Sequence, residues 1–125
     1  MVCIEDVYHA FGELMYAVAL ADGEIQQEEI IRFNKIIEKH QFAHKIKWSF
    51  FHEQEENTPL KVALEKALKT LTTYGPFEDL PFLFKALEEI ALAFNGIVIE
   101  ERNLIDNFRK DLHEQFKKDM RFSGY

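Results

Sequence analysis

Several features that would indicate particular classes of protein are absent from the sequence. It has a single cysteine, Cys3, so no internal disulfide can form and no cysteine-rich metal motif is present. The longest uncharged stretch, residues 90–99, is about half of the ~20 residues that a membrane-spanning helix needs. The N-terminus lacks the basic region of a signal peptide, and acidic residues such as Glu5 and Asp6 interrupt it. We therefore expect a cytoplasmic protein that does not insert into a membrane.

Basic charge is also scarce. Lys and Arg number 15 against 22 Asp and Glu, which gives a formal net charge of -7. This balance disfavours nucleic acid and anionic lipid surfaces and favours cations or basic partners. No Gly-x-Ser-x-Gly motif or phosphate-binding glycine loop occurs, and Cys3 has no histidine at an activating spacing. We therefore expect no nucleic-acid partner and no enzymatic activity, with an enzyme ranked third among the hypotheses.

Helical periodicity is what the sequence does have. Its 125 residues are 47% hydrophobic, which is enough for one domain spanning residues 1–125. Apolar residues recur at i, i+3, i+4 and i+7, and no segment alternates apolar with polar residues as a strand would. The pattern predicts an all-α, single-domain bundle of about six to seven helices. The expected helices cover about residues 4–21, 27–40, 43–55, 59–74, 80–94 and 100–120.

Turn and capping residues mark where these helices begin and end. Asp22-Gly23 is expected to end the first helix, because glycine readily adopts the left-handed conformation that closes a helix. Thr58 is expected as an N-cap with Pro59 at the first helical position. Asp79 is expected to cap the fifth helix, which would end at Asn95-Gly96.

A shift of 73 residues superimposes the two ends of the chain. It aligns glycine with glycine and apolar with apolar residues: Gly23 with Gly96, Leu14 with Leu87, Ile31 with Leu104, and Glu28 with Glu101. A single pair of repeats is not a solenoid. We therefore expect two related helical hairpins, about 4–40 and 77–120, that pack with approximate two-fold symmetry around middle helices at about 43–75.

The first turn, Ala-Asp-Gly-Glu-Ile-Gln-Gln-Glu-Glu, resembles the second half of an EF-hand loop. A standard EF-hand is excluded, because Val18 and Leu20 would stand at ligand positions 1 and 3 and neither can bind calcium. Two interpretations remain. Four carboxylates in this segment could converge on calcium, magnesium or manganese; these are Asp22, Glu24, Glu28 and Glu29. Alternatively they only form a turn and an acidic helix start, which the residues alone favour.

A helix that ends in Ala-Asp-Gly-Glu-Ile, is followed by Glu-Glu and is repeated in degenerate form resembles the TerB-like (tellurite-resistance) family. The resemblance covers most of the chain. It implies an all-helical bundle of two related halves, metal binding at the acidic turns, a link to tellurite and other chemical stress, and no enzymatic activity. By position it points to Asp22, Glu24, Glu28 and Glu29, and in the second half to Glu100 and Glu101. Asn95 and Ile97 depart from the acidic pattern there. A bound cation would relieve carboxylate repulsion, fix the angle between the first two helices and so alter a partner surface.

Two further features bear on partners. His40 and His44 have the i, i+4 spacing of a zinc pair, but the helix break at Phe42 indicates an ordinary loop. Aromatic residues gather at 48–51 and 77–84, where core packing is the expected use of most of them. If some of these aromatic side chains are exposed, they would favour the alternative function, a protein-interaction or homodimerisation module with no metal site.

Overall fold

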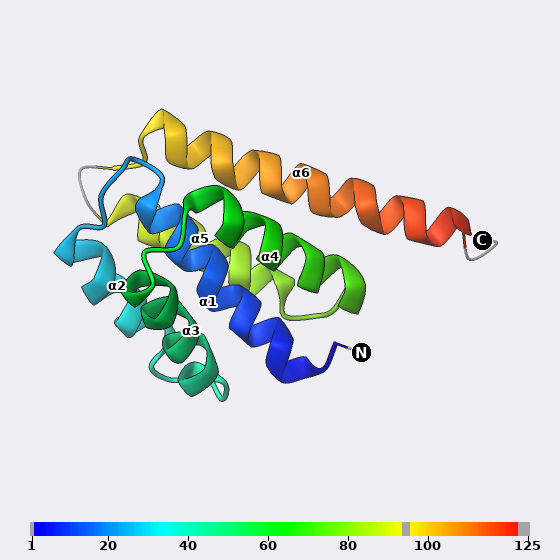
Figure 1. Ribbon diagram of the computed structural model, residues 1–125, viewed down its shortest axis with the longest axis horizontal. Helices are drawn as coiled ribbons and strands as arrows, with labels where there is room; N and C mark the ends of the chain where they lie inside the picture. The colour runs from blue at the N-terminus through cyan, green and yellow to red at the C-terminus, as the bar shows by residue number, and fades with distance from the viewer. Residues whose placement is uncertain (1, 94–95, 123–125) are drawn as a thin grey trace.

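Six helices make up the bundle in the part of the chain that the structure describes, which confirms the all-α prediction (Figure 1). The computed structural model describes residues 2–93 and 96–122. The helices are α1 (Ile4–Leu20), α2 (Gln27–Ile37), α3 (Ala43–Glu55), α4 (Leu60–Tyr74), α5 (Leu80–Leu92) and α6 (Ile99–Phe122). None of them is long and apolar enough to cross a membrane. The predicted end of the fifth helix at Phe94 and Asn95 lies outside the described residues.

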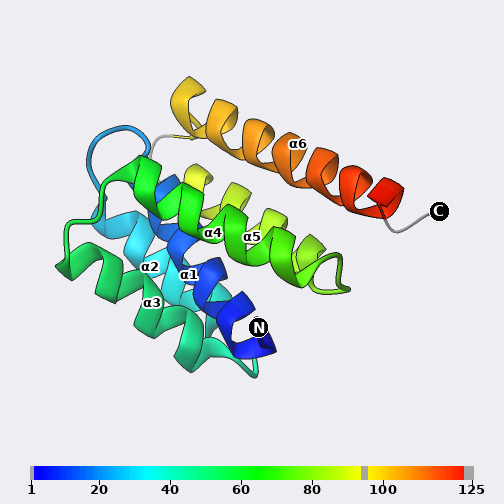
Figure 2. The ribbon, with the colours of Figure 1, turned by 45° about the vertical axis from the view of Figure 1, so that its right-hand side comes forward.

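Helix α1 runs through the middle of the bundle and packs against α3, α4 and α5 (Figures 1 and 2). Twelve of its 17 residues are buried, because apolar side chains occur around its whole circumference. Phe11, Leu14 and Met15 are fully buried. Burial of each such side chain contributes on the order of 2 kcal/mol before conformational entropy is subtracted.

A glycine on α1 allows α3 to approach closely. A Cβ atom placed on Gly12 would overlap the backbone oxygen of Ile46 and lie 2.9 Å from the Cβ atom of Ser49. The Ser49 hydroxyl donates a 2.7 Å hydrogen bond to the carbonyl oxygen of His9, so α1 and α3 are also linked where they cross. Any larger residue at position 12 would push these two helices apart.

Two predicted helix starts differ in detail from the structure. Helix α4 begins at Leu60, and Pro59 is the N-cap in extended conformation (φ -60, ψ 144), so the prediction of Thr58 as N-cap is wrong. The Thr58 carbonyl oxygen instead accepts a 2.7 Å hydrogen bond from the Tyr16 hydroxyl. Asp79 is the N-cap of α5 as predicted, but its side chain makes no capping hydrogen bond because other donors engage it.

Some large apolar side chains of the helices are exposed rather than buried. Ile31, which the 73-residue shift aligns with Leu104, is 58% exposed, because it lies on the opposite face of α2 from the buried Phe33 and Ile37. Trp48 is 59% exposed and stacks on the ring of His52 at a centroid distance of 4.7 Å. The hydrophobic face of α2 is therefore narrower than its sequence suggests.

Candidate functional site

Two neighbouring turns position the candidate site. The turn from α1 to α2 and the start of α6 lie side by side at one end of the bundle (Figures 1 and 2). Gly23 and Gly96 have φ angles of +103° and +80°, which glycine adopts without the steric cost that a side chain would add. Each glycine lies in the segment that leads into its helix, and the first turns of α2 and α6 are neighbours.

Both helices begin with the same hydrogen bond. The Gln26 N–H donates to Oε1 of Glu29 at 2.8 Å, and the Val98 N–H donates to Oε1 of Glu101 at 3.1 Å. In each case the acceptor is the third helical residue, as in a capping box. Glu101 is therefore the counterpart of Glu29, 72 residues earlier, and the predicted alignment of Glu101 with Glu28 is wrong by one residue.

These two glutamates are buried, which the sequence analysis did not predict. Glu29 is 1% exposed and Glu101 is 2% exposed. Each stands four residues before a fully buried apolar residue, Phe33 on α2 and Ile105 on α6, so each points from the inward face of its helix. A carboxylate on an apolar stripe was the signal in the sequence that could have identified them.

The carboxyl groups of Glu29 and Glu101 lie close enough that each affects the protonation of the other. Because two buried negative charges repel each other, protonation of one member of the pair is favoured. Burial raises the pKa of Glu29 to about 7, with further contributions from the charges of Glu101 and Asp22. Burial also raises the pKa of Glu101. The two carboxyl groups therefore titrate as a pair that retains a proton far above the usual range of glutamate.

The other predicted site residues lie around this pair rather than in it. Asp22 is exposed, accepts a 3.3 Å hydrogen bond from the Glu24 N–H, and its charge raises the pKa of both buried glutamates. Glu100 is exposed and its charge also raises the pKa of Glu101. Glu24 and Glu28 are exposed, and no hydrogen bond joins their side chains to the pair in residues 2–93 and 96–118. No three acidic, histidine or cysteine side chains in the described residues are grouped so as to hold a metal ion.

A second pair of buried glutamates, also not predicted, has a different environment. Glu13 on α1 is 9% exposed and Glu53 on α3 is 2% exposed. The Lys66 ammonium group on α4 lies 3.2 Å from Oε2 of Glu13 and 2.9 Å from Oε1 of Glu53. Desolvation acts to raise the pKa of Glu53, but hydrogen bonding and the charge of Lys66 outweigh it and lower that pKa. Burial outweighs Lys66 at Glu13, whose pKa is raised, so Lys66 compensates the charge of Glu53 more fully than that of Glu13.

A third polar cluster joins α1 to two loops. Oδ2 of Asp79 accepts hydrogen bonds from the Tyr8 hydroxyl at 2.7 Å and from Nε2 of His40 at 2.9 Å. The Phe42 N–H donates to Nδ1 of His40 at 2.9 Å, so the ring hydrogen is assigned to Nε2. Both nitrogens of His40 are therefore engaged within the protein, and His44 is exposed. This arrangement agrees with the prediction of a loop at His40.

No family model, curated protein or solved structure matches the chain. The resemblance to TerB-like proteins therefore depends on the turn residues quoted above, and what it implies about function is a proposal.

Proposed function

We propose that the protein is a non-enzymatic helical module that binds a divalent cation between Glu29 and Glu101. The supporting observation is the burial of two adjacent carboxyl groups at 1% and 2% exposure. In residues 2–93 and 96–118 no basic side chain forms an ion pair with either of them. Two buried carboxylates without a counter-charge repel each other, so the site favours uptake of a proton or a metal cation.

The chemistry of the pair fits a hard cation. Carboxylate oxygens are the ligands that calcium, magnesium and manganese prefer, and magnesium often takes only one or two carboxylates and keeps several waters. Glu29 and Glu101 would hold the ion, and Asp22 would add negative charge from the adjacent turn. Glu24, Glu28 and Glu100 would attract cations without coordinating them. The ion would supply the positive charge that a bound proton otherwise provides.

The proposed consequence of binding is mechanical. Glu29 is on α2 and Glu101 is on α6, so a shared cation would join the two helix starts and stabilise the folded state by mass action. Because the ion competes with the proton, its affinity would rise with pH. The resemblance to TerB-like proteins extends this proposal to a role in the response to tellurite and other chemical stress.

Titration calorimetry of chelator-treated protein tests this proposal with calcium, magnesium and manganese, and with zinc as a softer comparison ion. We expect binding that is tighter at about pH 8 than at about pH 6, because protons leave the pair over this interval. Glu29→Gln and Glu101→Gln should abolish binding, since each removes a charged ligand. Glu28→Gln is the matched control, because Glu28 is exposed and adjacent in sequence. The proposal fails if no ion binds more tightly than about 1 mM, or if the control weakens binding as much as Glu29→Gln.

A further inference from the structure

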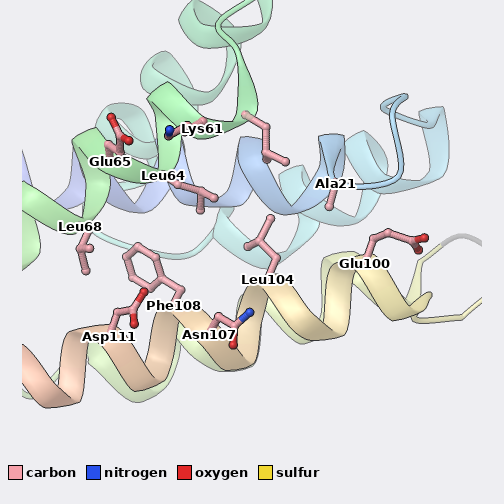
Figure 3. Close-up of a pocket in the computed structure, with 11 residues that line it drawn as sticks. Ala21, Lys61, Leu64, Glu65, Leu68, Glu100, Leu104, Asn107, Phe108 and Asp111 are labelled. Carbon is pink, nitrogen blue, oxygen red and sulfur yellow. The ribbon is translucent and has the colours of Figure 1, made fainter.

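An apolar groove runs between α4 and α6, separate from the carboxyl pair. Its volume is about 530 Å³. Leu64 and Leu68 project from α4 toward Leu104 and Phe108 of α6, so the floor of the groove is aliphatic and aromatic (Figure 3). Leu60 adds a third leucine from α4 at a spacing of four residues. Such spacing gives a continuous apolar stripe along one helix.

The dimensions of the groove match a helix. From Leu60 to Leu68 the stripe on α4 spans about 12 Å, and from Glu100 to Asp111 the wall on α6 spans about 16 Å, at 1.5 Å per residue. These lengths correspond to about two to three helical turns. Two approximately parallel walls with an apolar floor are the geometry by which a groove receives the apolar face of an amphipathic helix.

The rim of the groove is mainly acidic. Glu65 lies on the α4 rim, Asp111 on the α6 rim, and Glu100 near the end where α6 begins (Figure 3). All three are exposed, and Lys61 is the basic residue that lines the groove beside them. A helix that fits the floor would therefore be attracted further if it carried basic residues along its flanks.

We propose that this groove binds an amphipathic helix of a partner protein, with apolar anchors at i, i+4 and i+7 and with Lys or Arg on both flanks. A second copy of the chain fits less well, because groove-to-groove pairing about a two-fold axis would place the acidic rims against each other. The chain also carries a net charge of -7, which opposes self-association at this surface. The proposal is independent of cation binding, although Glu100 stands between the two sites.

Selection of an unbiased library of displayed helical peptides of about 14 residues, long enough to fill the groove, tests the proposal on the intact protein. We expect the selected sequences to share the apolar spacing and to be enriched in Lys and Arg at flanking positions. Fluorescence anisotropy should show that a selected peptide binds the Glu65→Lys/Asp111→Lys double variant about tenfold more weakly than wild type. Methyl resonances of Leu64 and Leu104 should shift when it binds.

Glu38→Lys/Glu55→Lys is the matched control, because it changes the same charge at exposed positions at the ends of α2 and α3. A copy of the selected peptide with Lys changed to Glu, tested on wild-type protein, repeats the test without altering the protein. The proposal is overturned if the selected peptides lack basic flanks, or if both double variants bind them equally. It is also overturned if sedimentation shows a dimer whose formation shifts the same methyl resonances, since a second copy would then occupy the groove.

Discussion

The protein buries two pairs of glutamates, and only one of them has a built-in cation. Glu13 and Glu53 share the ammonium group of Lys66, whose pKa is raised because the two carboxylates outweigh desolvation. Glu29 and Glu101 lie close together without such a partner in the described residues, and burial raises the pKa of both. The first pair therefore has a cation within the chain, although burial still raises the pKa of Glu13, whereas the second pair depends on protons or cations from the solvent. Two glutamate pairs with similar burial thus differ: the pair at Lys66 is linked by a cation within the chain, and the Glu29–Glu101 pair depends on protons or cations from the solvent.

The second pair makes stability depend on pH with a definite sign. The pKa of Glu29 is about 7 in the folded protein and 4.5 in the absence of burial. Between these values the folded state binds more protons than the unfolded state, so the free energy of unfolding falls as pH rises. The stabilisation that the proton on this pair provides is complete below about pH 4.5 and is lost by about pH 7 or slightly above. The Lys66-linked pair is mixed, because burial raises the pKa of Glu13 whereas hydrogen bonding and the charge of Lys66 lower the pKa of Glu53.

Removal of the built-in cation should have the largest effect. Lys66→Met leaves Glu13 and Glu53 buried without their counter-charge, and we expect a loss of about 3 kcal/mol in the free energy of unfolding near pH 7. Urea denaturation measures this loss, which should shrink at acidic pH as the carboxyl groups are protonated. Lys61→Met on the exposed face of the same helix is the control. An equal loss in both variants would show that the ion triad contributes nothing specific.

Neutralisation of the uncompensated pair should have the opposite sign. Glu29→Gln keeps an acceptor for the Gln26 N–H and offers a permanent donor to Glu101, so it imitates the protonated pair. We expect a gain of about 1 kcal/mol near pH 8 and no gain near pH 4, where wild type is already protonated. Denaturation curves across this range, with Glu28→Gln alongside, measure the difference. A gain that is constant with pH would mean that titration of the pair is not its cause.

A cation can also be introduced by mutation, which would make the second pair resemble the first. Asp22→Lys removes a negative charge and places an ammonium group near the pair on an exposed turn. We expect stabilisation of less than about 1 kcal/mol near pH 8, because the new charge is solvated. Denaturation measures this gain, and calorimetry should show that divalent cations no longer bind. Glu24→Lys in the same turn is the control, and an identical result there would point to general charge attraction.

The smallest expected effect isolates the charge of Asp22. Asp22→Asn removes that charge while it keeps an oxygen for the Glu24 N–H, so the pKa of Glu29 should fall by less than about one pH unit. Carbon-detected NMR of the side-chain carboxyl groups follows this titration directly. Lys35→Gln, a charge change on the exposed side of α2, should leave the Glu29 titration in place. No movement of the pKa in Asp22→Asn would remove Asp22 from the site.

The helices could be predicted because their periodicity is strong and glycine or proline follows most of them. All six were expected from the spacing of their apolar residues. The errors occur where a long-range contact overrides a local preference. Asp79 has the sequence of a side-chain cap, but Tyr8, 71 residues earlier, and His40 compete for its carboxylate. Thr58 similarly lies outside α4, and its carbonyl oxygen is bound by Tyr16.

The candidate site was predicted only in part. The acidic turns were found from composition, but the sequence does not show that Glu29 and Glu101 point inward while Glu24 and Glu28 face solvent. The 73-residue alignment placed Glu101 opposite Glu28, because it matched the two glycines, whereas Gly96 lies one residue nearer to the start of α6 than Gly23 lies to the start of α2. Local spacing specifies which helix face a residue occupies, whereas the partner across the bundle depends on how the hairpins pack.

The close crossing at Gly12 determines which part of the molecule is free to move. Backbone atoms of α1 and α3 are almost in contact there, so a relative shift of these helices would cause overlap or open a void. Helix α6 is attached by side chains such as Ile105, Phe108 and Leu112, and by the carboxyl pair at its start. Native-state hydrogen exchange should therefore show that α6 opens before α1. A ligand that binds to α6 therefore contacts the part of the molecule that opens more easily, whereas α1 and α3 keep their positions relative to each other.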